Sequence, residues 1–480
     1  MTDIVWFKRD LRVSDHEPLH KASTQNKIIP LYIVESDFWK QPDISDRHYK
    51  FLTDSLYDLN SSLQDLGQGL IIRVGDAEQI FSELIEEYAV ENIWSHEETW
   101  NNWTYQRDIK LRKLFNKKNV KWKEMQVNGV FRGLNDRKSW SRMFYQEMAK
   151  TPYGRPERLC SVNIKSEKLP SVNDLNIKSI ECPFIQIGGE RKAHHVMNSF
   201  LSTRAYDYSK NISSPLYSHE TCSRLSTYLA FGNVSLKQIF YYTKYATDNF
   251  KANKENINMM NLRSINAFKS RLRWRSHFIQ KLEDQPSIES QNLHEAYNSI
   301  RDGVFNEDLY HAWREGQTGF PLVDACMRSL IKTGWINFRM RAMIMSFASY
   351  NLWQPWQLTS PLLAELFVDY EPGIHIPQVQ MQSGVTGINL PRIYSVTKQS
   401  RDQDADGIWI KKIIPSLEGL DPDEIHDANL NGSYIPRIVD HKESSKFARD
   451  KIWAARKGQE FKTIARSVYL KHGSRKRRSA

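Results

Sequence analysis

The chain has 480 residues, of which 40% are hydrophobic, and its formal net charge is +11. This length suits two or three domains with sizeable cores, and no apolar run approaches the ~20 residues that a membrane-spanning helix needs. The N-terminus shows no secretory signal, so we expect a soluble, cytoplasmic protein that does not bind membranes.

The charge and the cysteines limit the partners and the metals. The positive charge suits a polyanion such as nucleic acid. Part of it lies in residues 471–478, which are either a solvated tail or a contact with a DNA backbone. No C-x-x-C pair is present, which argues against a zinc site or an iron–sulfur cluster. We therefore predict no metal and four free thiols, Cys160, Cys182, Cys222 and Cys326.

The first part of the chain alternates short apolar runs with amphipathic stretches. Helices are predicted between the strands, for example at residues 77–88 and 105–114. Alternating strands and helices indicate an α/β domain with a parallel, doubly wound sheet, which we assign to residues 1–130. The predicted strands are residues 3–7, 28–34, 69–74, 92–95 and 120–125.

The rest of the chain divides into two parts. Residues 131–191 are poorly periodic and rich in proline, so we predict an interdomain connector there. From residue 192 to 480 the apolar periodicity is helical and strand signals nearly vanish. This part is predicted to be an all-α domain.

The most informative run is residues 313–342, W-R-E-G-Q-T-G-F-P-L-V-D-A-C-M-R-S-L-I-K-T-G-W-I-N-F-R-M-R-A. Residues 318–321 form a turn before one apolar-periodic helix, and residues 333–335 break the chain before a second. The second helix carries Arg339 and Arg341 among large apolar side chains. Because a buried unpaired charge is costly, we expect these arginines to face an acid, a phosphate or a cofactor.

This run resembles the flavin-binding core of the cryptochrome/photolyase family, and residues 4–12, I-V-W-F-K-R-D-L-R, resemble its opening strand and loop. The resemblance covers nearly the whole chain. It implies an N-terminal α/β domain, a connector and an all-α C-terminal domain that binds FAD.

Residues 222–226, C-S-R-L-S, resemble the turn and helix start that hold the FAD pyrophosphate in that family. Hydroxyl and backbone N–H groups at a helix N-terminus favour a phosphate. The family has Thr or Ser where this chain has Cys222, so one hydroxyl contact is in doubt. A tyrosine upstream is expected against the cofactor, and Tyr208 fits that place better than Tyr206. The FAD contacts implied here are Tyr208, Cys222, Ser223, Arg224, Leu225 and Ser226.

Residues 268–275 resemble the helix beside the flavin and the lesion pocket. The resemblance implies cofactor-side positions for Phe268, Arg271, Trp274 and Arg275. Trp274 matches a lesion-stacking tryptophan of cyclobutane-dimer photolyases, and a plain core tryptophan is the alternative. Arg271 stands where those enzymes carry a glutamate that hydrogen-bonds the dimer. This reversal of charge argues against a direct transfer of dimer recognition.

Asn337 and Phe338 occupy the family's paired polar positions. Cyclobutane-dimer photolyases have a His-Asn pair there, and (6–4) photolyases have a His-His pair. Phe338 has no side-chain hydrogen-bond donor, so neither pocket is reproduced. We keep Asn337 as a candidate catalytic residue and Phe338 as a cofactor contact.

Arg341 corresponds to an arginine that lies against the flavin ring, and Asp369 and Glu371 correspond to acids near it. An Arg–Asp pair there would stabilise a reduced, anionic flavin, whereas a structural salt bridge is the alternative. The family's asparagine that faces the redox-active flavin nitrogen falls on His375, or on Gly373 in a shifted alignment. His375 is either a group that exchanges a proton with the flavin or a satisfied structural histidine.

The family's electron relay of three tryptophans is incomplete here. Trp356 occupies the middle position, the inner position falls on Pro377 or Val379, and the outer position falls near Gly303. We expect Trp356 to carry electrons if the relay is used, and candidate substitutes for the other two positions are Trp313, Trp335, Trp353 and Tyr350.

The antenna chromophore has no assignment. The folate-contacting Asn-Glu pair of some relatives aligns near Trp103 and Thr104, which do not support the same contact. Trp100 and Trp103 either stack on another chromophore or form a packed aromatic cluster.

The resemblance implies light-driven repair of pyrimidine dimers in damaged DNA by a monomer, with Arg339 and Arg392 at DNA-side positions. Either arginine is otherwise a solvated charge. The alternative function is a blue-light photoreceptor without repair, which Phe338, Arg271 and Pro377 favour. A pyridine-nucleotide redox enzyme is disfavoured, because no G-x-G-x-x-G motif is present.

Overall fold

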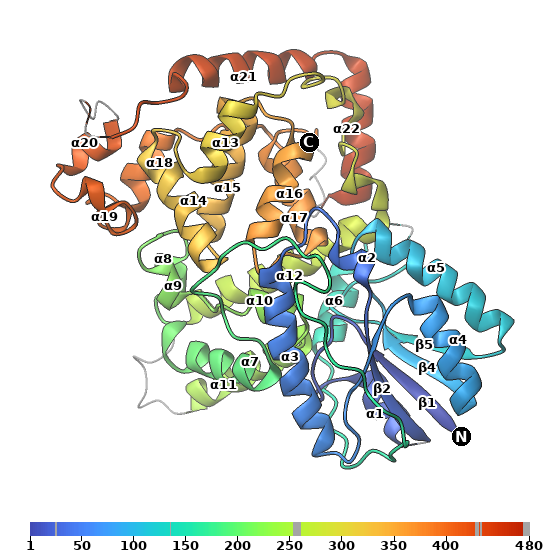
Figure 1. Ribbon diagram of the computed structural model, residues 1–480. Helices are drawn as coiled ribbons and strands as arrows, with labels where there is room; N and C mark the ends of the chain where they lie inside the picture. Colours follow the sequence, from blue (N-terminus) through green and yellow to red (C-terminus); the bar gives the residue numbers. More distant parts are fainter. Residues whose placement is uncertain (25, 135, 253–260, 428–431, 433, 474–480) are drawn as a thin grey trace.

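The computed structural model describes residues 1–480 except 25, 135, 253–260, 428–431, 433 and 474–480 (Figure 1). All five predicted strands are confirmed, and they form one parallel sheet in the order β3-β2-β1-β4-β5. Their bounds are β1 Thr2–Phe7, β2 Lys27–Val34, β3 Ile71–Val74, β4 Val90–His96 and β5 Lys121–Met125. The order reverses between β1 and β4, and ligands of such sheets bind beyond the carboxyl ends of the strands at this point.

The sheet is covered on both faces, because alternate residues of each strand point to opposite sides. Ile4 and Trp6 share one apolar core with residues of α4 (Ala77–Tyr88) and α5 (Asn102–Lys117). Val5 and Phe7 pack with α1 (Glu17–Ser23) and α3 (Asp46–Gln64) on the other face. The helix predicted at residues 77–88 has the bounds of α4, and residues 105–114 lie within α5.

The segment predicted as a connector is less irregular than expected. It contains α6 (Trp140–Met148), which buries Trp140, Phe144 and Met148 along one side. These residues recur at a spacing of four, the signal of an amphipathic helix, within a segment otherwise dominated by prolines. The rest runs over both domains: the Leu159 amide donates to the Leu66 carbonyl at 2.7 Å, and the Phe184 amide donates to the Lys332 carbonyl at 3.1 Å.

The remaining chain is helical, as predicted, and no strand follows β5 in the part that the structure describes (Figure 1). None of the described helices is both long and apolar enough to cross a membrane. The helices not yet named are α2 Ser36–Trp39, α7 Glu190–Ser199, α8 Tyr208–Asn211, α9 Ser218–Thr221, α10 Ser226–Ala230, α11 Leu236–Ala252, α12 Leu262–Asp284, α13 Glu307–Glu315, α14 Pro321–Thr333, α15 Phe338–Ser346, α16 Trp356–Leu366, α17 Pro372–Gln382, α18 Val396–Gln403, α19 Ile408–Ile413, α20 Pro422–Asp427, α21 His441–Ala455 and α22 Gln459–His472. Residues 474–478 of the predicted basic tail lie outside the described residues.

Asp324 stabilises the turn at residues 318–321, within the run 313–342. Its buried carboxylate accepts hydrogen bonds from the Thr318 amide at 2.8 Å, the Thr318 hydroxyl at 2.6 Å and the Gly319 amide at 3.1 Å. The Tyr434 hydroxyl donates to the same carboxylate at 2.9 Å. Four donors on one buried acid fix the entry into α14, and Gly334, with a φ of 67°, ends that helix.

The loop after β1 is hydrogen-bonded to the backbone of the helical domain, from the Arg12 side chain and from the Leu11 amide. Arg12 donates to the Gly232 carbonyl at 2.9 Å, and the Leu11 amide donates to the Phe231 carbonyl at 3.2 Å. A Cβ atom at Gly232 would lie 2.1 Å from the Arg9 carbonyl oxygen, so only glycine allows this approach. The loop after β1 is thereby fixed against the start of the helical domain.

Candidate functional site

Arg341 of α15 and Asp369, before α17, form a charged pair with two hydrogen bonds, at 2.9 and 2.8 Å. Arg341 also donates from Nε to the Ile336 carbonyl at 2.8 Å. Burial alone would raise the pKa of Asp369, but the charge and hydrogen bonds of Arg341, with a hydrogen bond from Ser226, hold it below its ordinary value. The prediction that Arg341 faces an acid is confirmed.

Arg224 shows that the segment 222–226 lies near the Arg341–Asp369 pair, because both charges act on it. It is buried, has a φ of 59°, and its guanidinium lies 3.9 Å from the centre of the Trp335 ring. Burial lowers its pKa to about 10, with smaller effects of the nearby charges of Asp369 and Arg341. Its Nη1 has no hydrogen-bond partner within the described chain.

Arg275 of α12 provides a second buried cation. Its Nη2 donates to Glu371 at 2.8 Å and to the Leu229 carbonyl at 3.1 Å, while Nη1 has no partner within the described residues. Burial lowers the pKa of Arg275 and raises that of Glu371, although each charge opposes the shift of the other. Buried N–H groups without a protein partner require another acceptor. The phosphate and carbonyl oxygens of FAD are acceptors of this kind, so Arg224 and Arg275 fit that cofactor.

The tyrosine expected near the cofactor is the buried one. The ring of Tyr208 lies 5.8 Å from that of Phe268 and 5.6 Å from that of Phe200, whereas Tyr206 is 44% exposed. Cys222 acts on the pKa of Tyr208, so the two side chains lie close together. Burial raises the pKa of the Cys222 thiol itself to about 12. At this position the chain offers a neutral thiol in place of the hydroxyl.

Gly373 and His375 lie in the first turns of α17. A Cβ atom at Gly373 would lie 2.7 Å from the Ile279 Cα, so the glycine lets α17 approach α12. The Nε2 atom of His375 lies 3.0 Å from both the hydroxyl and the carbonyl oxygen of Ser360. Burial lowers the pKa of His375 to about 4, so the ring is neutral at pH 7. These contacts give Gly373 and His375 a structural role, in addition to the expected role of facing the redox-active flavin nitrogen.

The comparisons with known proteins agree with this arrangement. Residues 3–133 match the family described as DNA photolyase, and residues 268–454 match the FAD binding domain of DNA photolyase. The chain is 27% identical over 457 residues to cryptochrome DASH of Gloeobacter violaceus, covering 89% of this chain and 88% of that protein. It is 26% identical over 473 residues to deoxyribodipyrimidine photo-lyase of Agrobacterium fabrum, covering 91% and 95%.

Two solved structures have the same fold. A bacterial class III photolyase from Agrobacterium tumefaciens superimposes with a TM-score of 0.80 at 24% identity, covering 95% of this chain and 98% of that one. An archaeal photolyase from Sulfolobus tokodaii, solved with two FAD molecules, gives 0.77 at 26% identity, covering 95% and 100%. The chain belongs to the cryptochrome/photolyase family. Its helical part contains the FAD-binding domain of that family.

The residues that the resemblance puts on a lesion face include an exposed aromatic ring and a cation. Phe338 is 43% exposed, and the guanidinium of the exposed Arg271 lies 5.6 Å from its ring. Trp274 is half-buried and stacks on Phe278, with ring centres 5.6 Å apart. Phe338 is therefore more accessible to a base than Trp274.

Asn337 is engaged in the fold. Its side-chain oxygen accepts from the Met340 amide at 3.1 Å and so caps α15, and its amide group donates to the Ser218 hydroxyl at 3.1 Å. Arg339 donates to the Tyr394 hydroxyl at 3.4 Å and faces no acid at hydrogen-bond distance within the described chain. Arg392 is exposed, and its backbone carbonyl accepts a hydrogen bond from the Ser346 hydroxyl at 3.2 Å.

The tryptophans expected in electron transfer or antenna binding are packed. Trp356 is buried and donates to the Asn292 side chain at 2.7 Å. Trp100 has the Arg9 guanidinium 3.1 Å from its ring centre, and the Trp103 ring lies 5.6 Å from Phe38. The interpretation of Trp100 and Trp103 as members of a packed aromatic cluster agrees with these contacts.

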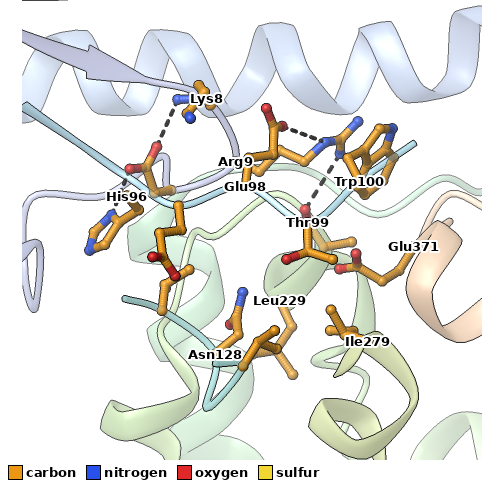
Figure 2. A pocket seen from close by; sticks show the side chains of 15 residues that line it. Lys8, Arg9, His96, Glu98, Thr99, Trp100, Asn128, Leu229, Ile279 and Glu371 are labelled. Atoms are coloured by element: carbon orange, nitrogen blue, oxygen red, sulfur yellow. Dashed lines mark hydrogen bonds and ion pairs between the residues drawn. The ribbon is translucent and has the colours of Figure 1, made fainter. Parts of the chain in front are cut away.

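Sequence reasoning missed a cavity between the domains. It lies beyond the carboxyl ends of β1 and β4, where the strand order reverses, and Glu371 of the flavin site forms part of its wall (Figure 2). Figure 2 shows Arg9, Thr99 and Trp100 on one side and Asn128, Leu229 and Ile279 on the other. The reversal of strand order was the signal that could have located it.

A buried acid with two histidines also escaped prediction. The Asp10 carboxylate accepts from His16 at 2.9 Å and from His96 at 2.7 Å, and the other nitrogen of His16 accepts from the Leu19 amide. Burial lowers the pKa of His96 to about 4. The three side chains could also offer ligand atoms to a metal. Their hydrogen bonds to one another account for the cluster without one.

Proposed function

We propose that this protein acts as a monomer and repairs pyrimidine dimers in DNA with light, as a deoxyribodipyrimidine photolyase-type lyase. Bound, reduced FAD would supply the excited electron that splits the dimer. The observation that carries the proposal is that two buried arginines, Arg224 and Arg275, have N–H groups without an acceptor in the described chain. The charges of Asp369 and Arg341 act on Arg224, and Arg275 pairs with Glu371. Relatives named deoxyribodipyrimidine photo-lyase support the assignment.

The chain's own residues would hold the cofactor and the lesion. Arg224 and Arg275 would bind acceptor atoms of the cofactor, and Arg341 would keep a positive charge beside the flavin while Asp369 fixes its orientation. Phe338 would stack on a base taken out of the duplex, and the Arg271 cation beside it would offset phosphate charge. Arg339 and Arg392 would contact the backbone on the same face.

The decisive experiment is a repair assay. Purified protein with reduced FAD is illuminated with defined cyclobutane and (6–4) substrates, both single- and double-stranded, and the restored bases are quantified. Light-dependent loss of one lesion would support repair and identify its type. If the protein binds damaged and intact DNA equally and repairs neither lesion, the proposal fails.

A cryptochrome-type blue-light photoreceptor without repair is the second candidate. The observation that favours it is the pair Asn337 and Phe338: the first caps α15, and the second offers no hydrogen bond to a lesion. A photoreceptor should change conformation on flavin photoreduction. Limited proteolysis in the dark and in the light, on protein shown to be inactive in repair, would test this candidate.

A further inference from the structure

Tyr370 forms an unusual hydrogen bond between the two domains. It is 5% exposed, and its hydroxyl donates to the Asp43 carboxylate at 2.5 Å, although the two residues are 327 positions apart. The second carboxylate oxygen of Asp43 has no hydrogen-bond partner within the described chain. A buried phenol is thus held directly on a basic oxygen.

The position of Tyr370 places it next to the flavin site. It stands between Asp369, which pairs with Arg341, and Glu371, which pairs with Arg275. Its Cα atom lies about 3.8 Å from those of both neighbours. The family resemblance puts the flavin ring against Arg341, so the phenol next to its partner Asp369 would lie within electron-transfer range of that ring.

The rings that pack on Tyr370 are uncharged, and the charges of Asp43, Glu289 and Arg9 act on its hydroxyl. His375 lies 5.3 Å from its ring, Trp100 lies 5.5 Å away, and His48 lies 6.2 Å away. Burial lowers the pKa values of His375 and His48 to about 4, so both are neutral at pH 7. Burial also raises the pKa of Asp43, against the effect of the hydrogen bond from Tyr370, which makes this carboxylate a stronger base than an exposed aspartate.

We infer that Tyr370 is the electron donor to the photoexcited, oxidised flavin and that Asp43 takes its proton. The phenol loses one electron to the flavin, which is the oxidant, while its O–H bond breaks and the proton bonds to the Asp43 carboxylate. A neutral tyrosyl radical and a neutral carboxylic acid remain. An external thiolate then returns one electron to the radical, and Asp43 returns the proton.

The surroundings of Trp100 favour Tyr370 as the place where the oxidised state rests. Arg9 lies 3.1 Å from the Trp100 ring, and a fixed cation at this distance opposes a second positive charge on that tryptophan. The tyrosyl radical carries no charge once its proton has moved, so Arg9 does not oppose it. This donor would act in place of the inner tryptophan, whose position falls on Pro377 or Val379.

The inference requires bound FAD but no DNA lesion, so it survives a failure of the repair proposal. Holoprotein with oxidised FAD is flashed with blue light without DNA, and the radical is followed by electron paramagnetic resonance and transient absorption. We expect a neutral tyrosyl radical whose formation slows in D2O. Tyr370→Phe should abolish that signal and slow flavin reduction by about tenfold, equivalent to a barrier 1.36 kcal/mol higher.

Two further variants keep the test interpretable. In Asp43→Asn the side-chain oxygen still accepts the hydrogen bond but takes no proton, so the radical yield should fall and the D2O effect should vanish while FAD content is unchanged. Tyr350→Phe removes another buried phenol, whose hydroxyl has no partner within the described chain, and should leave the signal intact. A tyrosyl radical signal that is undiminished in Tyr370→Phe or in Asp43→Asn overturns the inference. The inference also fails if Trp356→Phe abolishes the signal while Tyr370→Phe leaves it.

Discussion

Arg341 and Asp369 are held face to face by two hydrogen bonds of 2.9 and 2.8 Å, and a hydrogen bond from Ser226 reaches the same carboxylate. Three segments that are distant in the chain therefore meet at one acid. The charge of Arg341 keeps Asp369 ionised. A negative charge added at Ser226 would therefore be repelled by Asp369, because this carboxylate does not readily take up a proton.

We predict that Ser226→Asp empties the FAD site. A second carboxylate beside Asp369 would repel both that residue and the cofactor's pyrophosphate, at the start of α10. The flavin absorption of purified, reconstituted protein measures the effect. Ser226→Ala, which removes the hydroxyl without adding charge, should retain most of the flavin. Full flavin content in Ser226→Asp would show that the pyrophosphate lies elsewhere.

Arg392→Ala should weaken binding to damaged DNA and reduce the salt dependence. Each phosphate contact contributes about one unit to the log–log slope of affinity against salt, so one lost contact should flatten it by about that amount. Titrations at several salt concentrations test this. Lys117→Ala, at the exposed end of α5 in the sheet domain, is the matched control and should not change the slope.

Phe338→Ala should reduce discrimination between damaged and intact DNA and leave the salt slope unchanged. A stacked base contributes roughly 1–3 kcal/mol and reads the lesion, not the backbone. Competition binding between the two DNAs gives the ratio directly. If Trp274→Ala lowers the ratio and Phe338→Ala does not, the half-buried Trp274 is the ring that stacks.

Lys281→Met should stabilise the protein at neutral and acidic pH. Lys281 is 5% exposed, and burial, with a smaller effect of Arg137, lowers its pKa from 10.5 to about 7. Between these values the unfolded chain binds the extra proton, so the penalty for burying Lys281 is full below pH 7 and fades as the pH rises to 10.5. At about 1.36 kcal/mol per pKa unit, the variant should gain up to about 5 kcal/mol at pH 6.5 and almost nothing at pH 10.5. Urea unfolding at both pH values measures this, and Lys117→Met, at an exposed site, should show no such gain.

Acid should destabilise the fold well above the pH at which carboxylates titrate. Burial lowers the pKa values of His48, His96 and His375 from 6.5 to about 4. Their stabilising contribution is therefore complete above pH 6.5 and is lost as the pH falls from 6.5 to 4, where the unfolded chain takes up protons first. The urea midpoint should fall steeply from pH 6.5 to 5. A flat midpoint over this range would contradict the prediction.

The sequence predicted the elements whose signal is local. Each strand is a short buried run, and the turn at Asp324 was visible because Thr318 and Gly319, its donors, lie within six residues of it. The helix α6 was missed because prolines dominate the segment around it. The contacts of Asp10 with His96, and of Tyr370 with Asp43, arise only when distant segments dock, so no periodicity or spacing announces them.

Gly232 has a mechanical consequence. Because Gly232 has no side chain, the loop after β1 contacts the backbone of the helical domain. The sheet domain and the flavin-binding helices therefore cannot move apart without first breaking the hydrogen bonds that Leu11 and Arg12 donate. The two halves should therefore melt together in a single calorimetric transition. If the protein binds duplex DNA as proposed, the duplex would contact the outer surface of the joined domains, and the movement of a base into the site would come from the DNA.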